Sequence, residues 1–150
     1  MRTYLVVIDE SEEAGIALRF AARRAAKTGG AVEILALVPP SEFVQWGGVQ
    51  ATIEEEARQR AEALVAGAAG TLIEESGVRP TITVRQGDAV AVVQAMLADN
   101  PQVAALVLGA AANGGPGPLV AHFGVGAGTM PCPVMIIPGS LTREDIDRLS

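Results

Sequence analysis

The sequence predicts a single α/β domain over residues 1–150, built on an open five-stranded parallel sheet with helices on both faces. Short apolar runs rich in β-branched residues alternate along the chain with longer stretches of helical periodicity. The runs are mostly continuous rather than alternating, which is typical of parallel strands covered on both faces. A length of 150 residues fits one domain with a sizeable core.

Five apolar segments are the predicted strands. They lie at 4–8, 32–38, 81–85, 103–108 and 134–137. Pro39 and Pro40 close the second strand, because proline cannot donate a hydrogen bond to a sheet. A helical segment separates each strand from the next, and crossovers of this length join parallel strands.

Capping residues mark the first two helices. Ser11 is expected to cap the first helix, which ends at Gly29. Thr52 and Glu55 form a predicted capping box for a long second helix that ends before Gly77. Residues 41–50 are then a loop.

The remaining helices are shorter. Asp88 is expected to cap the third, whose apolar positions share one face. A weaker helix is predicted at 119–129, where Gly124, Gly126 and Gly128 each cost about 1 kcal/mol relative to alanine. Either close packing compensates for them or the helix is short or irregular. A short polar tail helix is predicted at 143–150, starting from Thr142.

Charge is distributed unevenly along the chain. Residues 100–142 form a stretch of 43 residues without Asp, Glu, Lys or Arg. Six prolines divide this stretch into pieces shorter than the roughly 18 apolar residues of a spanning helix, so no membrane segment is expected. The net charge of −6 disfavours nucleic acid as a partner.

Few residues offer metal or nucleophile chemistry. One histidine, His122, and one cysteine, Cys132, cannot assemble a usual zinc site, so no metal is expected. A single cysteine fits a reducing cytoplasm, and the first residues show no signal-peptide pattern. Ser11 is interpreted as a cap rather than a nucleophile, His122 as structural and Cys132 as an inert core thiol. No catalytic residues are predicted.

A ligand would bind beyond the carboxyl ends of the strands, where the strand order reverses. The first strand delivers Asp9 and Glu10 there, the second delivers Pro39, and the fourth delivers a glycine-proline loop at 109–118. This loop enters a helix with Pro118 at its first position. It is either a mere tight connection or a cradle whose backbone N–H groups hold phosphate.

The order of these segments resembles the universal stress protein family. The resemblance is carried by 4–11, by 32–40, by Gln86-Gly87-Asp88, by Leu106-Val107-Leu108-Gly109 and by 131–138. It covers nearly the whole chain. It implies a cytoplasmic protein with a Rossmann-like, adenine nucleotide alpha hydrolase-like sheet.

The resemblance also implies partners and a site. Members are commonly homodimers in which the last strand of one subunit pairs with the last strand of the other. In this sequence that strand consists of Val134, Met135, Ile136, Ile137 and Pro138. Many members bind ATP, with magnesium, and others do not. The matching nucleotide-binding positions are Ile8, Asp9, Glu10, Val38, Pro39, Gly109, Ala110, Gly114, Gly115, Gly117 and Leu119.

The glycine motif departs from that of the ATP-binding members. Those carry Gly-x-x-Gly and, after a fixed spacer, Gly with Ser or Thr. Here Ala112 stands three residues after Gly109, and Pro118 follows Gly117, with neither a hydroxyl nor an N–H to offer. Each lost hydrogen bond to a charged group is worth about 1.5–3 kcal/mol.

Three functions therefore stay open. The first is a non-catalytic, homodimeric sensor that binds a small ligand such as ATP or AMP through a variant glycine loop. The second is a dimerisation or protein-interaction module of the same fold without nucleotide. The third is a weak ATPase, for which the sequence shows no base, nucleophile or metal set. Asp9 and the glycine cluster favour the first, and Ala112 and Pro118 favour the second.

Overall fold

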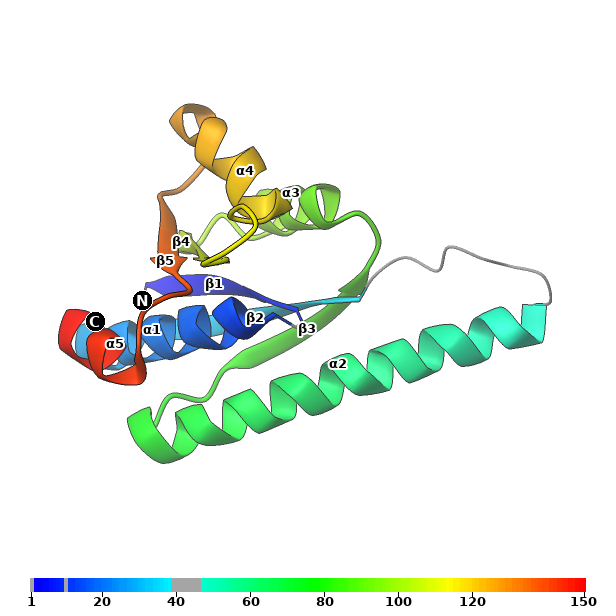
Figure 1. Ribbon diagram of the computed structural model, residues 1–150, viewed down its shortest axis with the longest axis horizontal. Helices are drawn as coiled ribbons and strands as arrows, with labels where there is room; N and C mark the ends of the chain where they lie inside the picture. The colour runs from blue at the N-terminus through cyan, green and yellow to red at the C-terminus, as the bar shows by residue number, and fades with distance from the viewer. Residues whose placement is uncertain (1, 10, 39–46) are drawn as a thin grey trace.

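A computed structural model of the protein describes residues 2–9, 11–38 and 47–150, with residues 47–54, 57, 68, 69 and 71 described by their backbone alone (Figure 1). Its centre is one sheet in the order β3-β2-β1-β4-β5, in which every neighbouring pair is parallel. The strands are β1 (Thr3–Ile8), β2 (Ala31–Val38), β3 (Thr81–Gln86), β4 (Val103–Ala110) and β5 (Val134–Pro138). The predicted five-stranded parallel sheet is confirmed.

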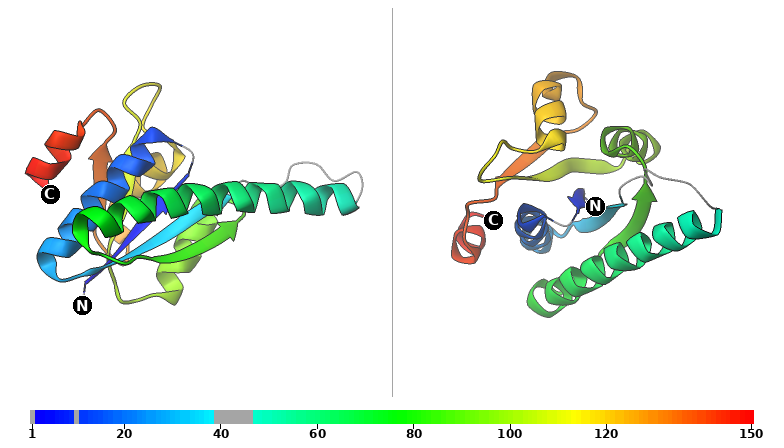
Figure 2. Two further views of the ribbon diagram at one scale, coloured as in Figure 1. Left: turned by 90° about the horizontal axis from the view of Figure 1, so that it is seen from below. Right: turned by 45° about the vertical axis from the view of Figure 1, so that its right-hand side comes forward.

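Helices cover both faces of the sheet, as the two views of Figure 2 show. The helices are α1 (Glu12–Thr28), α2 (Gly47–Ser76), α3 (Ala89–Asp99), α4 (Pro118–Val125) and α5 (Arg143–Leu149). One face packs against α1, α2 and α5, and the other against α3 and α4. None of the helices in the described part of the chain is both long and apolar enough to cross a bilayer.

The strand β1 divides the core into two clusters because successive side chains point to opposite faces. Val6 packs with Leu18 on the α1 face, and Leu5 packs with Phe123 on the α3 and α4 face. All four are at most 1 % exposed. Burial on both faces explains why the run 4–8 is continuously apolar.

Most predicted helix ends are confirmed. Gly29 has a left-handed backbone (φ 66°) and ends α1, and Gly77 (φ 72°) follows α2. The carboxylate of Asp88 accepts a hydrogen bond from the Ala91 N–H at 3.0 Å, so Asp88 caps α3. Thr142 and Asp145 form a capping box at the start of α5.

Four predicted strands differ from the structure by one residue at one end, and three other predicted boundaries are wrong by two residues or more. The helix α2 begins at Gly47 rather than Thr52, so Thr52 is inside the helix and is not its cap. The strand β4 continues to Ala110, because pairing with β5 extends as far as Pro138. The helix α4 ends at Val125 and a separate 3₁₀ turn, Ala127–Thr129, follows it. The helix is therefore short, which was one of the predicted alternatives: Gly124 lies inside it, Gly126 follows its last residue and Gly128 lies in the 3₁₀ turn.

Candidate functional site

The order of the strands reverses between β1 and β4. The chain moves outward from β1 through β2 to β3, and then returns to the other side of β1 for β4 and β5. A crevice opens at the carboxyl ends of two strands at such a switch point, because their connections leave in opposite directions. The site predicted from the sequence should therefore lie between the ends of β1 and β4.

A cleft lies at this point. Residues after β1, the first turn of α1, the end of β4 and the start of α4 line it, with Leu37 of β2 and Ala89 of α3. The lining residues are Val7, Asp9, Ser11, Glu13, Ala14, Leu37, Ala89, Leu108, Gly109, Pro116, Gly117, Pro118, Leu119 and Val120. Its volume is about 120 Å³, below the roughly 300–1,000 Å³ of sites that enclose a drug-sized ligand.

A hydrogen-bonded turn joins β1 to α1 at the edge of the cleft. The Asp9 Oδ1 atom accepts a hydrogen bond from the Ser11 N–H at 2.9 Å and a second from the Ser11 hydroxyl. Ser11 precedes α1 as predicted, but its side chain makes no capping hydrogen bond because it bonds Asp9 instead. These two bonds orient the exposed Asp9 carboxylate in the lining of the cleft.

The loop between β4 and α4 depends on glycine. Gly114, Gly115 and Gly117 have φ values of 77°, 92° and 100°, which side chains other than hydrogen disfavour. The Ala111 N–H donates to the Pro116 carbonyl at 3.3 Å and closes the loop. Pro118 occupies the first turn of α4 as predicted. The first turn of a helix leaves backbone N–H groups without an intrahelical acceptor, so Leu119 carries a donor at the cleft.

Gly109 has a structural role that needs no ligand. A Cβ atom at this position would lie 2.3 Å from the Glu13 carbonyl oxygen. A Cβ at Gly139, which follows β5, would lie 2.6 Å from the Ala110 carbonyl oxygen and 3.0 Å from the Glu13 Cβ. Both glycines therefore let the ends of β4 and β5 approach the first turn of α1 closely.

The structure brings together part of the predicted site. Asp9, Gly109, Gly117 and Leu119 line the cleft. Five other predicted positions are not among its lining residues, namely Ile8, Val38, Ala110, Gly114 and Gly115. Glu10 and Pro39 lie outside the described residues.

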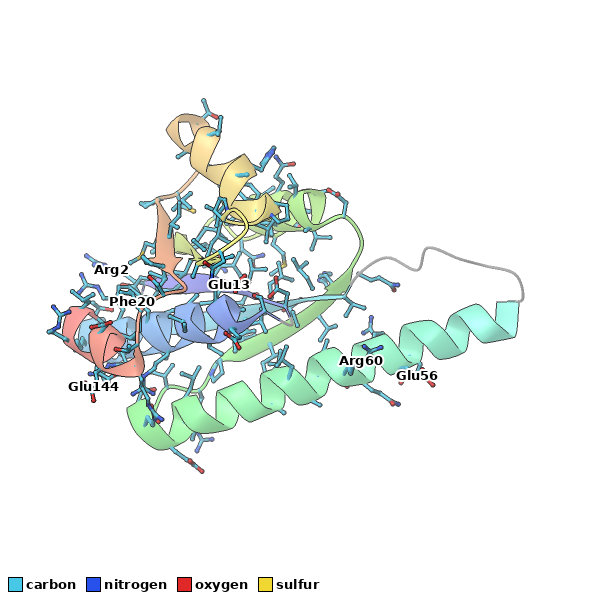
Figure 3. All side chains as sticks on the ribbon, in the orientation of Figure 1. Arg2, Glu13, Phe20, Glu56, Arg60 and Glu144 are labelled. Carbon is cyan, nitrogen blue, oxygen red and sulfur yellow. The ribbon has the colours of Figure 1, made fainter. Side chains whose placement is uncertain are left out.

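Sequence reasoning missed Glu13. Its side chain is half-buried and belongs to the cleft lining, and Figure 3 shows it beside the loop that follows β4. The available signal was its position, because the first turn of a helix that follows a central strand lies at the carboxyl edge of the sheet. Two acidic residues, Asp9 and Glu13, thus line a site predicted to hold phosphate.

His122 and Cys132 lie elsewhere. His122 is exposed beside a hollow of about 390 Å³ between α3 and α4, where its Nε2 atom is 3.4 Å from Gln94 Nε2. Burial raises the pKa of the Cys132 thiol, and a backbone hydrogen bond from Leu106 lowers it by less. In the described part of the chain, no three His, Cys, Asp or Glu side chains gather as a metal site would require.

Comparison with known proteins identifies relatives of this fold. The model of the universal stress protein family matches residues 1–138. The chain is 18 % identical to universal stress protein UspA from Lactobacillus plantarum, with a TM-score of 0.77 over 91 % of this chain and 97 % of that one. A search of curated proteins gives no significant match.

Two further solved structures hold nucleotides. The universal stress protein from Archaeoglobus fulgidus, in complex with dAMP, is 20 % identical, with a TM-score of 0.60 over 91 % of this chain and 97 % of that one. A universal stress family protein from Arabidopsis thaliana, with AMP bound, is 16 % identical, with a TM-score of 0.52 over 92 % of each chain. At these identities the likeness shows the fold alone.

Proposed function

Because the chain belongs to the universal stress protein family, we propose that it is a cytoplasmic, non-catalytic regulatory protein that binds an adenine nucleotide in the cleft between β1 and β4. The observation that carries this proposal is the position of the cleft. It lies at the switch point of the sheet, with Asp9 on one side and the start of α4 on the other. Structural neighbours that hold dAMP and AMP support the choice of ligand.

Each part of the nucleotide has a suitable partner in the cleft. The Asp9 carboxylate accepts hydrogen bonds from the ribose hydroxyls or the base amino group. The phosphate lies against Gly117 and the N-terminus of α4, where backbone N–H groups and the helix dipole favour an anion. Leu37 and Val7 offer apolar contact to the base. If ATP is the ligand, magnesium would accompany its phosphates.

Replacement of Asp9 by asparagine is expected to weaken AMP binding about tenfold or more. Asparagine keeps an Oδ1 acceptor for the Ser11 N–H but removes the charge, and a hydrogen bond to a charged group is worth about 1.5–3 kcal/mol. Isothermal titration calorimetry of the purified Asp9→Asn variant with AMP measures the loss.

Asp99→Asn is the matched control for this titration. Asp99 is an exposed carboxylate at the far end of α3, which runs back toward the start of β4 and away from the cleft. The control is expected to bind AMP as the unmodified protein does. Equal affinities for Asp9→Asn and Asp99→Asn would remove Asp9 from the site.

We further propose that the protein forms a homodimer through β5. This strand is one edge of the sheet, and its backbone is free to pair with a second copy. Ile136 on this strand is 42 % exposed, and Val125 of α4, which is on the same side of the sheet, is 92 % exposed. The exposure of these apolar side chains beside an edge strand supports the proposed interface 134–138.

Replacement of Ile136 by aspartate is expected to shift the protein to monomers. A charge in the middle of an apolar interface costs several kcal/mol when it has no partner. Sedimentation equilibrium measures the molecular mass. Ile82→Asp is a matched control, because Ile82 lies on β3, at the opposite edge of the sheet, and is 43 % exposed. Dimers of the Ile136→Asp variant would contradict an interface on β5.

A second function, a protein-interaction module without nucleotide, is favoured by two observations. The cleft volume is small, and Gly109 is explained by its contact with α1. If this function is correct, AMP, cyclic AMP and ATP with magnesium all give no heat at millimolar concentration, and the β5 dimer remains.

A further inference from the structure

We propose that the cleft selects adenine ligands with few phosphates, adenosine and AMP over ATP, and that Glu13 is a specificity-determining residue for this choice. The inference rests on the proposed function, because it concerns what the same cleft accepts. It follows from the charge of the cleft, from the fixed position of Glu13 and from the kind of donors that face a phosphate.

The charge of the cleft is negative. Its lining contains two carboxylates, Asp9 and Glu13, and no Lys or Arg among the described residues. The described segments that supply most of the lining, 3–9, 11–18 and 103–125, contain neither Lys nor Arg. Arg85 lies near the end of β3, two strands from β1, where its Nη1 atom is 3.4 Å from the Val84 carbonyl oxygen.

Glu13 cannot move away from the cleft by a shift of its backbone. The ends of β4 and β5 pack against it so closely that a Cβ on Gly109 or Gly139 would lie 3.0 Å from the Glu13 Cβ. The residue is in the first turn of α1. The backbone of Glu13 is therefore fixed beside the ends of β4 and β5, and the residue stays in the lining of the cleft.

Gly117 and the start of α4, which would bind the phosphate, compensate only weakly for the negative charge of Asp9 and Glu13. Their donors are backbone N–H groups, and Pro118 removes one of them at the first position of α4. One phosphate fits these donors and the dipole of one helix. Each additional phosphate adds negative charge near Asp9 and Glu13, the described lining supplies no Lys or Arg to balance it, and like charges repel. The small cleft also favours the smaller ligands.

The experiment is a set of calorimetric titrations with adenosine, AMP and ATP, each with magnesium and with EDTA. We expect the unmodified protein to bind AMP about tenfold or more tightly than ATP in EDTA, and to prefer AMP by a smaller factor with magnesium, because the cation neutralises part of the charge of ATP. In the Glu13→Gln variant the ratio of the ATP and AMP dissociation constants should fall by roughly three- to tenfold. The same ratio should fall when salt is raised from 0.05 to 0.5 M, because salt screens the repulsion.

Glu12→Gln is the matched control. Glu12 is in the same helical turn and carries the same charge, but it is exposed and outside the cleft lining. In the Glu12→Gln variant the ratio of the ATP and AMP dissociation constants should stay within about twofold of its value in the unmodified protein. Tighter binding of ATP than of AMP, or equal effects of the two substitutions, would overturn the selectivity while leaving adenine binding intact. If no adenine compound binds, the proposed function itself fails, and with it this inference.

Discussion

Replacement of Ile146 by alanine is expected to lower the free energy of unfolding by about 2–4 kcal/mol. Ile146 is on α5 and is 0 % exposed, in the same core cluster as Ala22 of α1 and Val6 of β1. Truncation to alanine removes buried apolar area and leaves a cavity that the neighbouring helices can fill only in part. Urea denaturation followed by circular dichroism measures the change.

Leu149→Ala is the control for Ile146. Leu149 is on the same short helix but is 49 % exposed, so its truncation is expected to cost under about 1 kcal/mol. Equal losses for the two variants would mean that α5 does not dock through Ile146. The comparison tests whether a segment beyond the part matched by the family model, 1–138, is part of the core of this protein.

Ion pairs orient α5 against α1 and α2. Arg19 of α1 donates from Nε to Asp147 Oδ1 at 2.9 Å and from Nη2 to Asp147 Oδ2 at 3.0 Å. Arg19 and Arg143 both pair with Glu75 of α2. These groups are partly exposed, and such pairs usually contribute no more than about 1 kcal/mol each. Burial of Ile146 is therefore the larger stabilising contribution.

Replacement of Gly109 by alanine is expected to lower the free energy of unfolding by about 1–3 kcal/mol. The added Cβ would lie 2.3 Å from the Glu13 carbonyl oxygen and 2.6 Å from the Glu13 carbonyl carbon. Both atoms are backbone, so the first turn of α1 or the end of β4 must shift. Because this shift alters the cleft, AMP affinity should fall as well. Urea denaturation and calorimetry measure the two effects.

Gly15→Ala tests whether the loss is specific to position 109. Gly15 is inside α1, two residues from Glu13, and an added Cβ there would meet nothing within 4 Å. Alanine at this helical position is expected to stabilise the protein by up to about 1 kcal/mol. A Gly109→Ala variant as stable as the unmodified protein would show that β4 does not approach α1 as closely as described.

The core of the fold could be predicted from the sequence because it depends on local signals. The run 4–8 is apolar on both faces, and burial on both faces is what a central parallel strand requires. Asp88 and Gly29 act within one turn of their own helices, so their roles follow from neighbouring residues. The position of the cleft follows from the reversal of strand order, which the alternation of strands and helices implies.

The missed features depend on contacts between distant segments. Ile146 and Leu149 are the two apolar residues of a polar helix, and only the docking of α5 on α1 shows that Ile146 is the buried one. The strand β4 extends to Ala110 because β5 pairs with it, although a glycine at 109 favours a loop. Glu13 faces the cleft because Gly109 and Gly139 let two strands approach α1. None of these contacts is visible in the periodicity of one segment.

The most direct test of the central claim, that an adenine ligand binds between β1 and β4, is a titration of ¹⁵N-labelled protein with AMP, followed by backbone amide chemical shifts. We predict saturable shifts at Asp9, Ser11, Gly117 and Leu119, which line this cleft. Shifts confined to Gln94, His122 and Thr129, which line the hollow between α3 and α4, would place the ligand elsewhere. No shifts at millimolar AMP would contradict nucleotide binding.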